Sequence, residues 1–473
     1  ALSTYPQKHQ TIRGCYVMHK LPHSCHFGVK KPSNKNPRKK GLLDRRNHAK
    51  FFQMLINSDC NVGGYTARPK NRTGIVCDYR MALHEAYDRH PERPARIEAV
   101  YSDLWLQGLV AKCVKYKPRP ATREQLSLAH SQSHIENVQR TSSKPTHDFD
   151  GDTFANQFSS TAAHLAAGSL IQITEQVVKG NVDNGFAIIR PPGHHAECNT
   201  ALGFCLFNNA AVAALHAQKR LGVKRILILD WDIHHGNGTQ HILEDNRNIM
   251  YMSMHRSDYG QYFPQTGHVH EVGRGAGEGF TVNLPWHEDE MGDAEYMKAF
   301  EMIVMPIARQ YNPELVIISA GFDAVRGDPV GGYDVSPELF GKMTEMMMTL
   351  AKGKVVLALE GGYSLRGIAA SSSSCVRALL GEKSAHLDYS RPLKYNAILC
   401  INSCIRHQRP YWSKLSDIEL LEDPTKIEFE PSESLFDHFM KIKHLTSYRP
   451  YSDPLDDAIS NVREYPSAQR IAV

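Results

Sequence analysis

Five short apolar runs recur along the sequence, and four of them are followed at once by polar, reactive or glycine-rich residues. The runs occupy residues 185–190, 225–230, 249–254, 314–320 and 354–360. Continuous apolar runs of this length are typical of parallel strands covered on both faces. The stretches between them, such as 208–220 and 294–311, have the spacing of amphipathic helices. The alternation predicts an α/β fold: an open, mostly parallel sheet with helices on both faces, and an active site at the strand C-terminal ends.

Composition divides the 473 residues into three parts. Residues 1–70 include a basic stretch at 30–40 and predict a basic, flexible extension, with a nuclear-import signal as the sharper alternative. Residues 71–415 predict the catalytic domain, and residues 416–473 a C-terminal tail or linker. One cluster in the extension could bind a metal, although its spacing fits no common zinc template. Its members are Cys15, His19, His23, Cys25 and His26.

Overall composition excludes several classes of protein. The net charge of +5 is too small to favour direct nucleic-acid binding, and no apolar run reaches the roughly 18 residues of a membrane span. The ten cysteines lack the spacing of a disulfide framework, which predicts reduced thiols. The sequence starts at Ala1 without the apolar core of a signal peptide, and we expect a region of a longer protein.

The segment LDWDIHHGNG at residues 229–238 predicts a metal site. Asp232 and His234 are two residues apart and would share one face of an extended segment, and Asp323 follows another predicted strand. Two carboxylates and one imidazole can hold a divalent ion with open positions, as catalytic zinc sites do. A more oxygen-rich set would favour magnesium or manganese. The structural alternative is a buried ion pair.

A histidine pair and a tyrosine supply the remaining chemistry. His194 and His195 can be tuned differently if a carboxylate stands behind one ring and an amide behind the other, and Asp230 and Asn237 are placed for these two roles. Tyr363, in LEGGYSL, could donate its hydroxyl to a developing oxyanion, with Gly361 and Gly362 allowing the loop to bend. A tyrosine packed at a helix start is the alternative.

The motifs RPPGHHAE, DWDIHHGNGTQ, SMHR, SAGFDA and LEGGY, in this order, resemble those of the zinc-dependent histone deacetylases from about residue 74 to about residue 415. The resemblance implies the arginase/deacetylase fold and a zinc hydrolase that removes acetyl groups from N6-acetyl-lysine in histones or other proteins. It makes Asp232, His234 and Asp323 the zinc ligands. It makes His195 the general base and acid, with His194 as an electrostatic partner paired to Asp230, and it makes Tyr363 the group that polarises the carbonyl.

The resemblance also implies a tunnel for the substrate. Phe204 and Phe263 match its aromatic walls, with Gly203 beside them, and Asp148 is a candidate contact for the substrate backbone, although its loop departs from the family pattern. A lysine stem has four methylenes, and burying each contributes about 0.8 kcal/mol. Two rings can enclose that stem, while a cationic head would be disfavoured next to Zn²⁺, so the site would favour the acetylated form.

Potassium sites are expected by the same resemblance. Asp230 and Ser253 match side-chain ligands of a potassium ion close to the zinc. Main-chain oxygens would come from Asp232, His234 and Met254. A second potassium site would use backbone oxygens of Leu243, Asn246, Ile249 and Phe280.

Three residues and one segment bear on the branch of the family. Asn237 resembles class II enzymes, and Tyr363 resembles the active, tubulin-deacetylase-like group, class IIb. Val330, in GDPVGG, stands where a polyamine-specific relative has a glutamate that attracts a second cation. The alternatives are an acetylpolyamine deacetylase and a catalytically silent acetyl-lysine-binding scaffold. Residues 391–415 resemble the closing helix of class II domains, with Ile398, Ile401 and Ile405 on one face.

The implied partners are acetylated proteins, such as histone tails or tubulin, and a corepressor complex. The implied setting is the regulation of chromatin and transcription, in the nucleus and the cytoplasm. No membrane association is expected.

Overall fold

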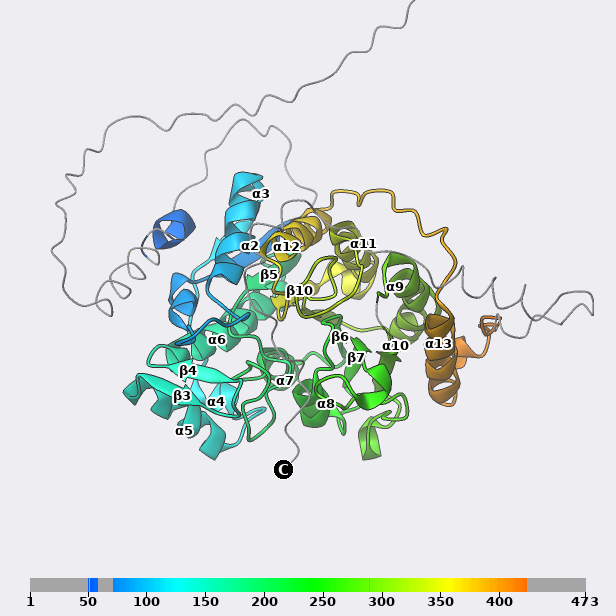
Figure 1. Ribbon diagram of the computed structural model, residues 1–473, viewed down its shortest axis with the longest axis horizontal. Coiled ribbons are helices and arrows are strands. Elements are labelled where there is room, and N and C mark those ends of the chain that lie inside the picture. The colour runs from blue at the N-terminus through cyan, green and yellow to red at the C-terminus, as the bar shows by residue number, and fades with distance from the viewer. Residues whose placement is uncertain (1–49, 51, 58–70, 289, 423–473) are drawn as a thin grey trace, which may run out of the picture. The chain divides into compact units, whose positions relative to one another are not determined.

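An eight-stranded parallel sheet forms the centre of the protein, in the order β2-β1-β5-β10-β9-β6-β7-β8 (Figure 1). The structure is a computed structural model that describes residues 50, 52–57, 71–288 and 290–422. The five predicted strands are all present, and they are the five consecutive strands from β5 to β7 in the sheet order, with β8 beyond β7 at the edge. They are β5 Asn184–Ile188, β6 Ile226–Asp230, β7 Ile249–Arg256, β9 Leu315–Ala320 and β10 Val355–Leu359. The predicted α/β fold with a parallel sheet is therefore confirmed.

Three strands were not anticipated from the sequence, and they lie toward the two edges of the sheet. β1 covers Thr73–Cys77, β2 covers Val114–Tyr116 and β8 covers Thr281–Trp286. β2 is short and largely exposed, so it has no apolar run. β8 contains Asn283 and Pro285, and a proline that cannot donate a backbone hydrogen bond is tolerated at an edge.

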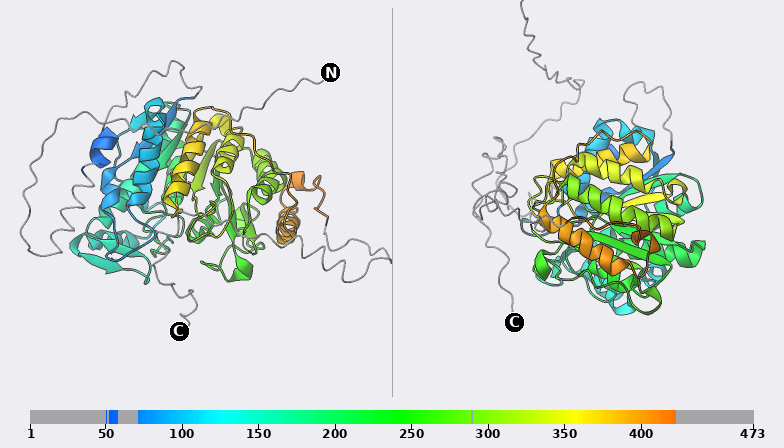
Figure 2. Two further views of the ribbon diagram at one scale, coloured as in Figure 1. Left: turned by 45° about the horizontal axis from the view of Figure 1, so that its top comes forward. Right: turned by 90° about the vertical axis from the view of Figure 1, so that its right-hand side faces the viewer.

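Helices cover both faces of the sheet. α6 (Ser159–Val178) and α7 (Asn209–Leu221) contact the strands from one face. α2 (Ala95–Leu106), α12 (Leu365–Leu379) and α11 (Pro337–Met347) lie side by side on the other face, as Figure 2 shows. The α11 helix begins as its sequence predicts, because the Ser336 side chain accepts the backbone N–H of Leu339 and Pro337 takes the first position.

Two helical segments differ in detail from their sequence patterns. The predicted helix at 294–311 is α9 (Asp293–Ala299), a π-helical turn (Phe300–Val304) and α10 (Met305–Tyr311), and Pro306 stands at the start of α10, where its missing N–H breaks the α-helical ladder. In α13 (Tyr395–Gln408), Ile401 and Ile405 are buried as predicted. Ile398 is only half-buried, and Ala397 and Cys404 complete the buried face in its place.

The remaining elements are short and connect these layers. They are η1 Tyr79–Leu83, α3 Leu109–Lys112, α4 Arg123–Leu126, α5 Gln132–Arg140, η2 Thr141–Ser143, β3 Thr146–Asp148, β4 Phe154–Asn156, α8 Asn237–Leu243, η3 Asp258–Gly260, η4 Gly275–Gly277, η6 Ala351–Gly353 and η7 Ser413–Leu415. β3 and β4 form a separate antiparallel pair.

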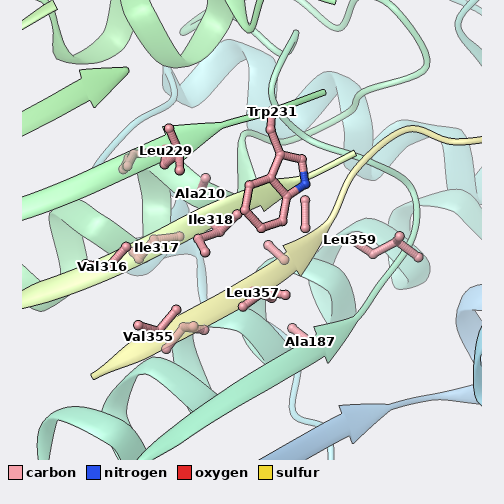
Figure 3. Packing of buried hydrophobic residues seen from close by; sticks show 14 of the residues in the cluster. Ala187, Ala210, Leu229, Trp231, Val316, Ile317, Ile318, Val355, Leu357 and Leu359 are labelled. Atoms are coloured by element: carbon pink, nitrogen blue, oxygen red, sulfur yellow. The ribbon is translucent and has the colours of Figure 1, made fainter. Parts of the chain in front are cut away.

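The apolar core fills the space between the sheet and its helices. Figure 3 shows side chains of β9, including Ile317 and Ile318, beside Leu357 of β10 and below the indole of Trp231. All four side chains are fully buried. Close packing on both faces holds the strands in place and so fixes the positions of the loops that leave their carboxyl ends.

The domain boundaries predicted at residues 71 and 415 remain predictions. All described residues belong to the unit His48–Val473. Within the predicted N-terminal extension, residues 52–57 are helical, and Phe52 packs edge-on against Tyr101 of α2 at 5.9 Å between ring centroids. At the other end, Leu421 exchanges backbone hydrogen bonds with the Asn402 side chain. None of the helices in the described part of the chain has the length and hydropathy to cross a bilayer.

Candidate active site

Four neighbouring strands of the sheet deliver the chemically active side chains. The strands β5, β10, β9 and β6 are adjacent in that order, although the chain visits them in a different order. The loop after β5 carries His194 and His195, and the loop after β6 carries Asp232 and His234. Asp323 follows β9, and Tyr363 follows β10. Because parallel strands share one carboxyl edge, these loops meet at a single point outside the sheet.

Asp232, His234 and Asp323 come together as a potential metal site. All three are buried, and each offers one ligand atom within 4.8 Å of the others. The Nδ1 atom of His234 lies 3.1 Å from Asp232 Oδ1 and 3.2 Å from Asp323 Oδ2. Backbone N–H groups hold the carboxylates: Ile233 donates to Asp323 Oδ1 at 2.8 Å, and Gly361 donates to Asp232 Oδ2 at 2.8 Å. The ligand atoms are therefore preorganised.

Asp232 and His234 converge for a different reason from the one that their spacing suggested. Residues 232–234 form a bend rather than an extended segment. The backbone N–H of His234 donates to Asp232 Oδ1 at 2.9 Å, and the N–H of Asp232 donates to Asp230 Oδ1 at 3.1 Å. Carboxylates thus shape the loop through local hydrogen bonds, and the expectation of a shared strand face was wrong.

The charges of this cluster fit a bound cation. Burial and the neighbouring charge of Asp232 raise the pKa of Asp323 to about 7. Burial acts to lower the pKa of His234, but hydrogen bonds and charge from the two aspartates raise it to about 9. The raised pKa values mean that Asp323 and His234 hold protons that partly neutralise the two carboxylates. A divalent cation bound at the same place would supply that neutralising charge instead. One imidazole nitrogen and two carboxylate oxygens are ligands that suit zinc.

Metal affinity should therefore increase with pH. Protons on Asp323 and His234 compete with the metal below the pKa values of about 7 and about 9, and each must leave before its atom can bind. We expect the dissociation constant for Zn²⁺ to fall about tenfold per pH unit for each proton released, between pH 6 and pH 8. Competition with a chromophoric chelator measures this, and an affinity that is constant over the range would contradict it.

Two glycines permit the close packing of this site. A Cβ at Gly321 would lie 2.0 Å from Asp232 Oδ2. A Cβ at Gly361 would lie 2.3 Å from Asp323 Oδ2 and 2.5 Å from Asp232 Oδ2. Glycine is therefore needed at position 361 because the backbone there lies against the two carboxylates. The bend expected at the Gly361–Gly362 pair occurs at Gly362, whose φ is 111°.

Gly361→Ala should weaken metal binding about 10–100-fold, because the new methyl displaces the two carboxylates that hold the metal. The dissociation constant for Zn²⁺ measures this. Gly222→Ala is the control for backbone strain alone, since a Cβ at that position meets no atom within 4 Å but the φ of 73° disfavours any side chain. An affinity unchanged in Gly361→Ala would show that the carboxylates can move away without loss.

The histidine pair has two electrostatic environments. His194 Nδ1 lies 3.0 Å from Asp230 Oδ2, and His195 Nδ1 lies 2.8 Å from Asn237 Oδ1. Burial opposes charge on His194, but the charges of Asp232 and Asp230 raise its pKa to about 10. Burial and the adjacent cationic histidines lower the pKa of His195 well below its usual range. His194 is therefore charged and His195 neutral at pH 7, and only His195 can accept a proton.

Tyr363 is buried in the loop that follows β10. Its ring makes an edge contact with Phe204 at 6.0 Å, and the guanidinium of Arg96 lies over it at 5.1 Å. Its backbone N–H donates to Asp328 Oδ2 at 2.6 Å, and Arg96 Nε donates to the carbonyl of Gly362 at 2.6 Å. Burial raises the pKa of Tyr363 well above its usual range, so the hydroxyl keeps its proton.

The predicted substrate contacts divide into two groups. Phe263 is 43% exposed, and its ring lies 5.0 Å from that of His195. Phe204 adopts a φ of 69° and lies near Tyr363. A Cβ at Gly203 would lie 2.6 Å from His195 Cδ2, so glycine is required beside the ring. These three residues surround the histidine and the tyrosine.

The other two predicted contacts, Asp148 and Val330, are held by local structure. Asp148 is exposed at the end of β3, and its Oδ1 accepts the N–H of Gly151 at 2.7 Å. Val330 is half-buried, and its carbonyl accepts the hydroxyl of Tyr262 at 2.9 Å. Their contact with a substrate stays a prediction.

The residues expected to bind potassium lie on β6 and β7, in the segment between them that contains α8, and, for Phe280, directly before β8. Asp230 and Ser253 are register partners in the sheet, and Met254 follows on β7. The carbonyls of Leu243 and Asn246 accept turn hydrogen bonds, and that of Phe280 accepts the N–H of Tyr251. The Cys15–His26 cluster and the basic stretch at 30–40 lie outside the described residues.

Several supporting residues were missed from the sequence. Glu360 Oε2 accepts the N–H of Gly193 at 2.6 Å and so holds the histidine loop. The ring of Tyr262 stacks on that of His234 at 5.3 Å. Arg96 and Arg190 share the buried carboxylate of Glu92 at 3.0 and 2.6 Å. Glu360 and Asp328 lie inside the quoted motifs, and a polar residue that follows an apolar run was the signal that could have identified them. No such signal marks Tyr262.

Comparisons with known proteins agree with this geometry. The family model of the Histone deacetylase domain matches residues 90–379. Histone deacetylase 15 of Arabidopsis thaliana is 45% identical over 333 residues, covering 69% of this chain and 60% of that protein. Histone deacetylase 7 of Homo sapiens is 41% identical over 376 residues, covering 72% of this chain and 40% of that protein. The chain therefore spans only part of the length of these relatives.

A solved structure is also similar along most of its length. The crystal structure of the HDA15 HD domain is 42% identical and superposes with a TM-score of 0.70. The similarity covers 73% of this chain and 96% of that chain. The range matched by the family model, residues 90–379, includes the ends of all four strands that carry the site.

Proposed function

The chain belongs to the histone deacetylase family and has its arginase/deacetylase fold, and on that premise we propose that it hydrolyses the amide of N6-acetyl-lysine in proteins. The observation that carries the proposal is the joint placement of a buried Asp–His–Asp triad and two histidines with opposite charge states. A silent acetyl-lysine-binding scaffold would not need a neutral base beside a metal site. The three candidate metal ligands, the neutral histidine and the tyrosine that the proposal uses are all among the described residues.

Zinc, held by Asp232, His234 and Asp323, would supply Lewis-acid polarisation of the amide carbonyl and a lowered pKa for water. His195 supplies the base. Its Nδ1 donates to Asn237 Oδ1, since an amide oxygen only accepts, and this leaves a lone pair on Nε2. His195 Nε2 can take a proton from water and return it to the departing lysine amine.

His194 and Tyr363 act on charge rather than on the proton. His194 stays cationic against Asp230, so it offsets negative charge that develops beside it. Tyr363 keeps its hydroxyl proton and can donate it in a hydrogen bond to the carbonyl oxygen as that oxygen becomes more negative. Phe204 and Phe263 flank these groups, and two aromatic rings suit the apolar stem of a lysine.

The proposal is tested with the full chain loaded with zinc. We expect hydrolysis of a fluorogenic acetyl-lysine peptide that a hydroxamate chelator inhibits, with a kcat/KM at least about tenfold above that for acetylspermidine. The neutral Val330, in place of an acidic group, supports the preference for the peptide. Preferential hydrolysis of acetylspermidine would favour the polyamine alternative. Folded, zinc-loaded protein that hydrolyses neither compound would overturn the proposal.

The finer assignments are proposals of the same kind. Asn237 and Tyr363 support class II membership of the active, tubulin-deacetylase-like group. The Asp230 side chain and the Ser253 hydroxyl, which are register partners on β6 and β7, support a structural potassium ion, which thermal unfolding in potassium and in sodium salts would test. Family membership is the support for three further proposals: histone tails or tubulin as substrates, a corepressor complex, and a distribution between nucleus and cytoplasm. Imaging of the tagged full chain would test the distribution.

A further inference from the structure

The side-chain amide of Asn237 is held from both of its ends. Its Oδ1 faces His195 Nδ1 at 2.8 Å, and its Nδ2 donates to Glu197 Oε1 at 2.6 Å. Asn237 is 3% exposed, so neither end of the amide has ready access to water as a substitute partner. The carboxylate of Glu197 accepts and does not donate, so this contact distinguishes the two ends of the amide.

Glu197 is itself fixed on three sides. Its backbone N–H donates to the carbonyl of Thr200 at 2.9 Å, and its own carbonyl lies 2.9 Å from His130 Nδ1. His241, at the surface on α8, places Nδ1 2.8 Å from the same Oε1 atom that accepts from Asn237. The carboxylate therefore links the buried amide to a surface histidine. Nothing in the proposed chemistry uses Glu197 directly.

The orientation of this amide decides which nitrogen of His195 carries the proton. With Oδ1 toward the ring, Nδ1 must donate and Nε2 is left free to accept a proton. If the amide were reversed, Nδ2 would face the ring, Nδ1 would have to accept, and the proton would move to Nε2. A histidine with its proton on Nε2 cannot act as the base that the hydrolysis needs.

We propose that Glu197 is a positioning residue that locks the Asn237 amide and thereby holds His195 in the tautomer with a free Nε2. The proposal rests on the proposed function for its catalytic consequence, but the tautomer itself does not depend on any activity. Glu197 follows His195 by two residues, so a single loop carries both the base and the group that orients it through Asn237.

Kinetics give the first test. Glu197→Ala should lower kcat for the acetyl-lysine peptide about 10–30-fold, with KM within about twofold and zinc content unchanged. Glu197→Gln keeps an acceptor oxygen for Asn237 Nδ2 and should retain at least about a third of the wild-type kcat. A purely structural role would affect stability in both variants alike and would not separate them.

A second glutamate–histidine pair provides the matched control. Glu175 on α6 lies 2.9 Å from His216 Nε2 on α7, partly buried and not in contact with the loops of the site. Glu175→Ala breaks this pair and should lower the melting temperature without changing kcat. Wild-type kcat in Glu197→Ala, or equal losses in Glu197→Ala and Glu197→Gln, would overturn the positioning role.

The tautomer can be observed without turnover. In zinc-loaded full chain labelled with ¹⁵N-histidine, long-range ¹H–¹⁵N spectra report the proton position on His195, whose signals are identified by their loss in His195→Ala. We expect Nδ1–H in at least about tenfold excess in the wild type and a clear mixture in Glu197→Ala. An unchanged tautomer in Glu197→Ala overturns the inference. An inactive wild type with the expected tautomer change refutes only the proposed function.

Discussion

Asp323→Ala is expected to remove both the metal and the activity. The change deletes one of the three side chains that can hold the ion and leaves two. The metal's stabilisation of developing charge amounts to several kcal/mol, so turnover of the acetyl-lysine peptide should fall about 10⁴-fold. Metal analysis by mass spectrometry and the peptide assay, performed on the same protein, measure the two losses. Full retention of zinc would contradict the assignment of Asp323 as a ligand.

Asp323→Asn separates metal loss from misfolding. Asp323 Oδ1 accepts the buried N–H of Ile233 at 2.8 Å, and alanine leaves that donor without a partner, which costs about 1–3 kcal/mol. Asparagine preserves the acceptor and the volume but replaces a charged oxygen with a neutral amide. We expect Asp323→Asn to fold with near wild-type stability and still to bind zinc poorly. If only the alanine variant lost zinc, the loss would be attributable to folding.

Tyr363→Phe should lower kcat about 10²–10³-fold, the usual cost of losing one donor to a developing oxyanion. The ring contacts with Phe204 and Arg96 do not involve the hydroxyl, so the phenyl ring should stay in place. We therefore expect KM to change less than about threefold and the zinc content to be unaffected. Steady-state kinetics with metal analysis make the measurement. A loss of zinc equal to that of Asp323→Ala would refute the separation of the two roles.

Tyr311→Phe is the control for removal of a buried tyrosine hydroxyl. The Tyr311 hydroxyl donates to the carbonyls of Ile226 and Asn248 at 3.2 and 2.8 Å, at the end of β6 opposite the site. Its removal should reduce the free energy of unfolding by about 1 kcal/mol and leave kcat unchanged. A loss of turnover in this variant would mean that stability, rather than the Tyr363 hydroxyl, limits the rate.

The strands were predictable where their surroundings are uniform. β6 and β9 are buried along their whole length and are apolar apart from Asp230 and Ser319 near their carboxyl ends, so the apolar run defines the element. β2 and β8 lie at the edges of the sheet; β2 is largely exposed, whereas β8 is buried although it contains Asn283 and Pro285. Their sequences mix polar and apolar residues, and a local pattern cannot separate such a strand from a loop.

Within the site, residue identities were predictable and their supports were not. Asp232, His234 and Asp323 stood out because ionisable groups directly after apolar runs need a reason. The resemblance to a known family then gave His195 and Tyr363 their roles. Glu197, Glu360 and Arg96 act through hydrogen bonds to other loops. Glu197 and Glu360 stand inside the quoted motifs, but the local sequence does not indicate which distant groups these three residues contact.

The sequence by itself determined that parallel strands exist and that chemistry follows four of them, because burial on both faces is a property of each run alone. Only the tertiary structure decided that β5, β10, β9 and β6 are neighbours. That order brings Asp323 to Asp232, and it places the loop that carries Tyr363 beside the histidine loop, which Glu360 holds through the N–H groups of Gly193 and His194. It depends on how helices pack across the whole sheet, and since no short segment contains that information, the partners of each catalytic group could be known only from the folded chain.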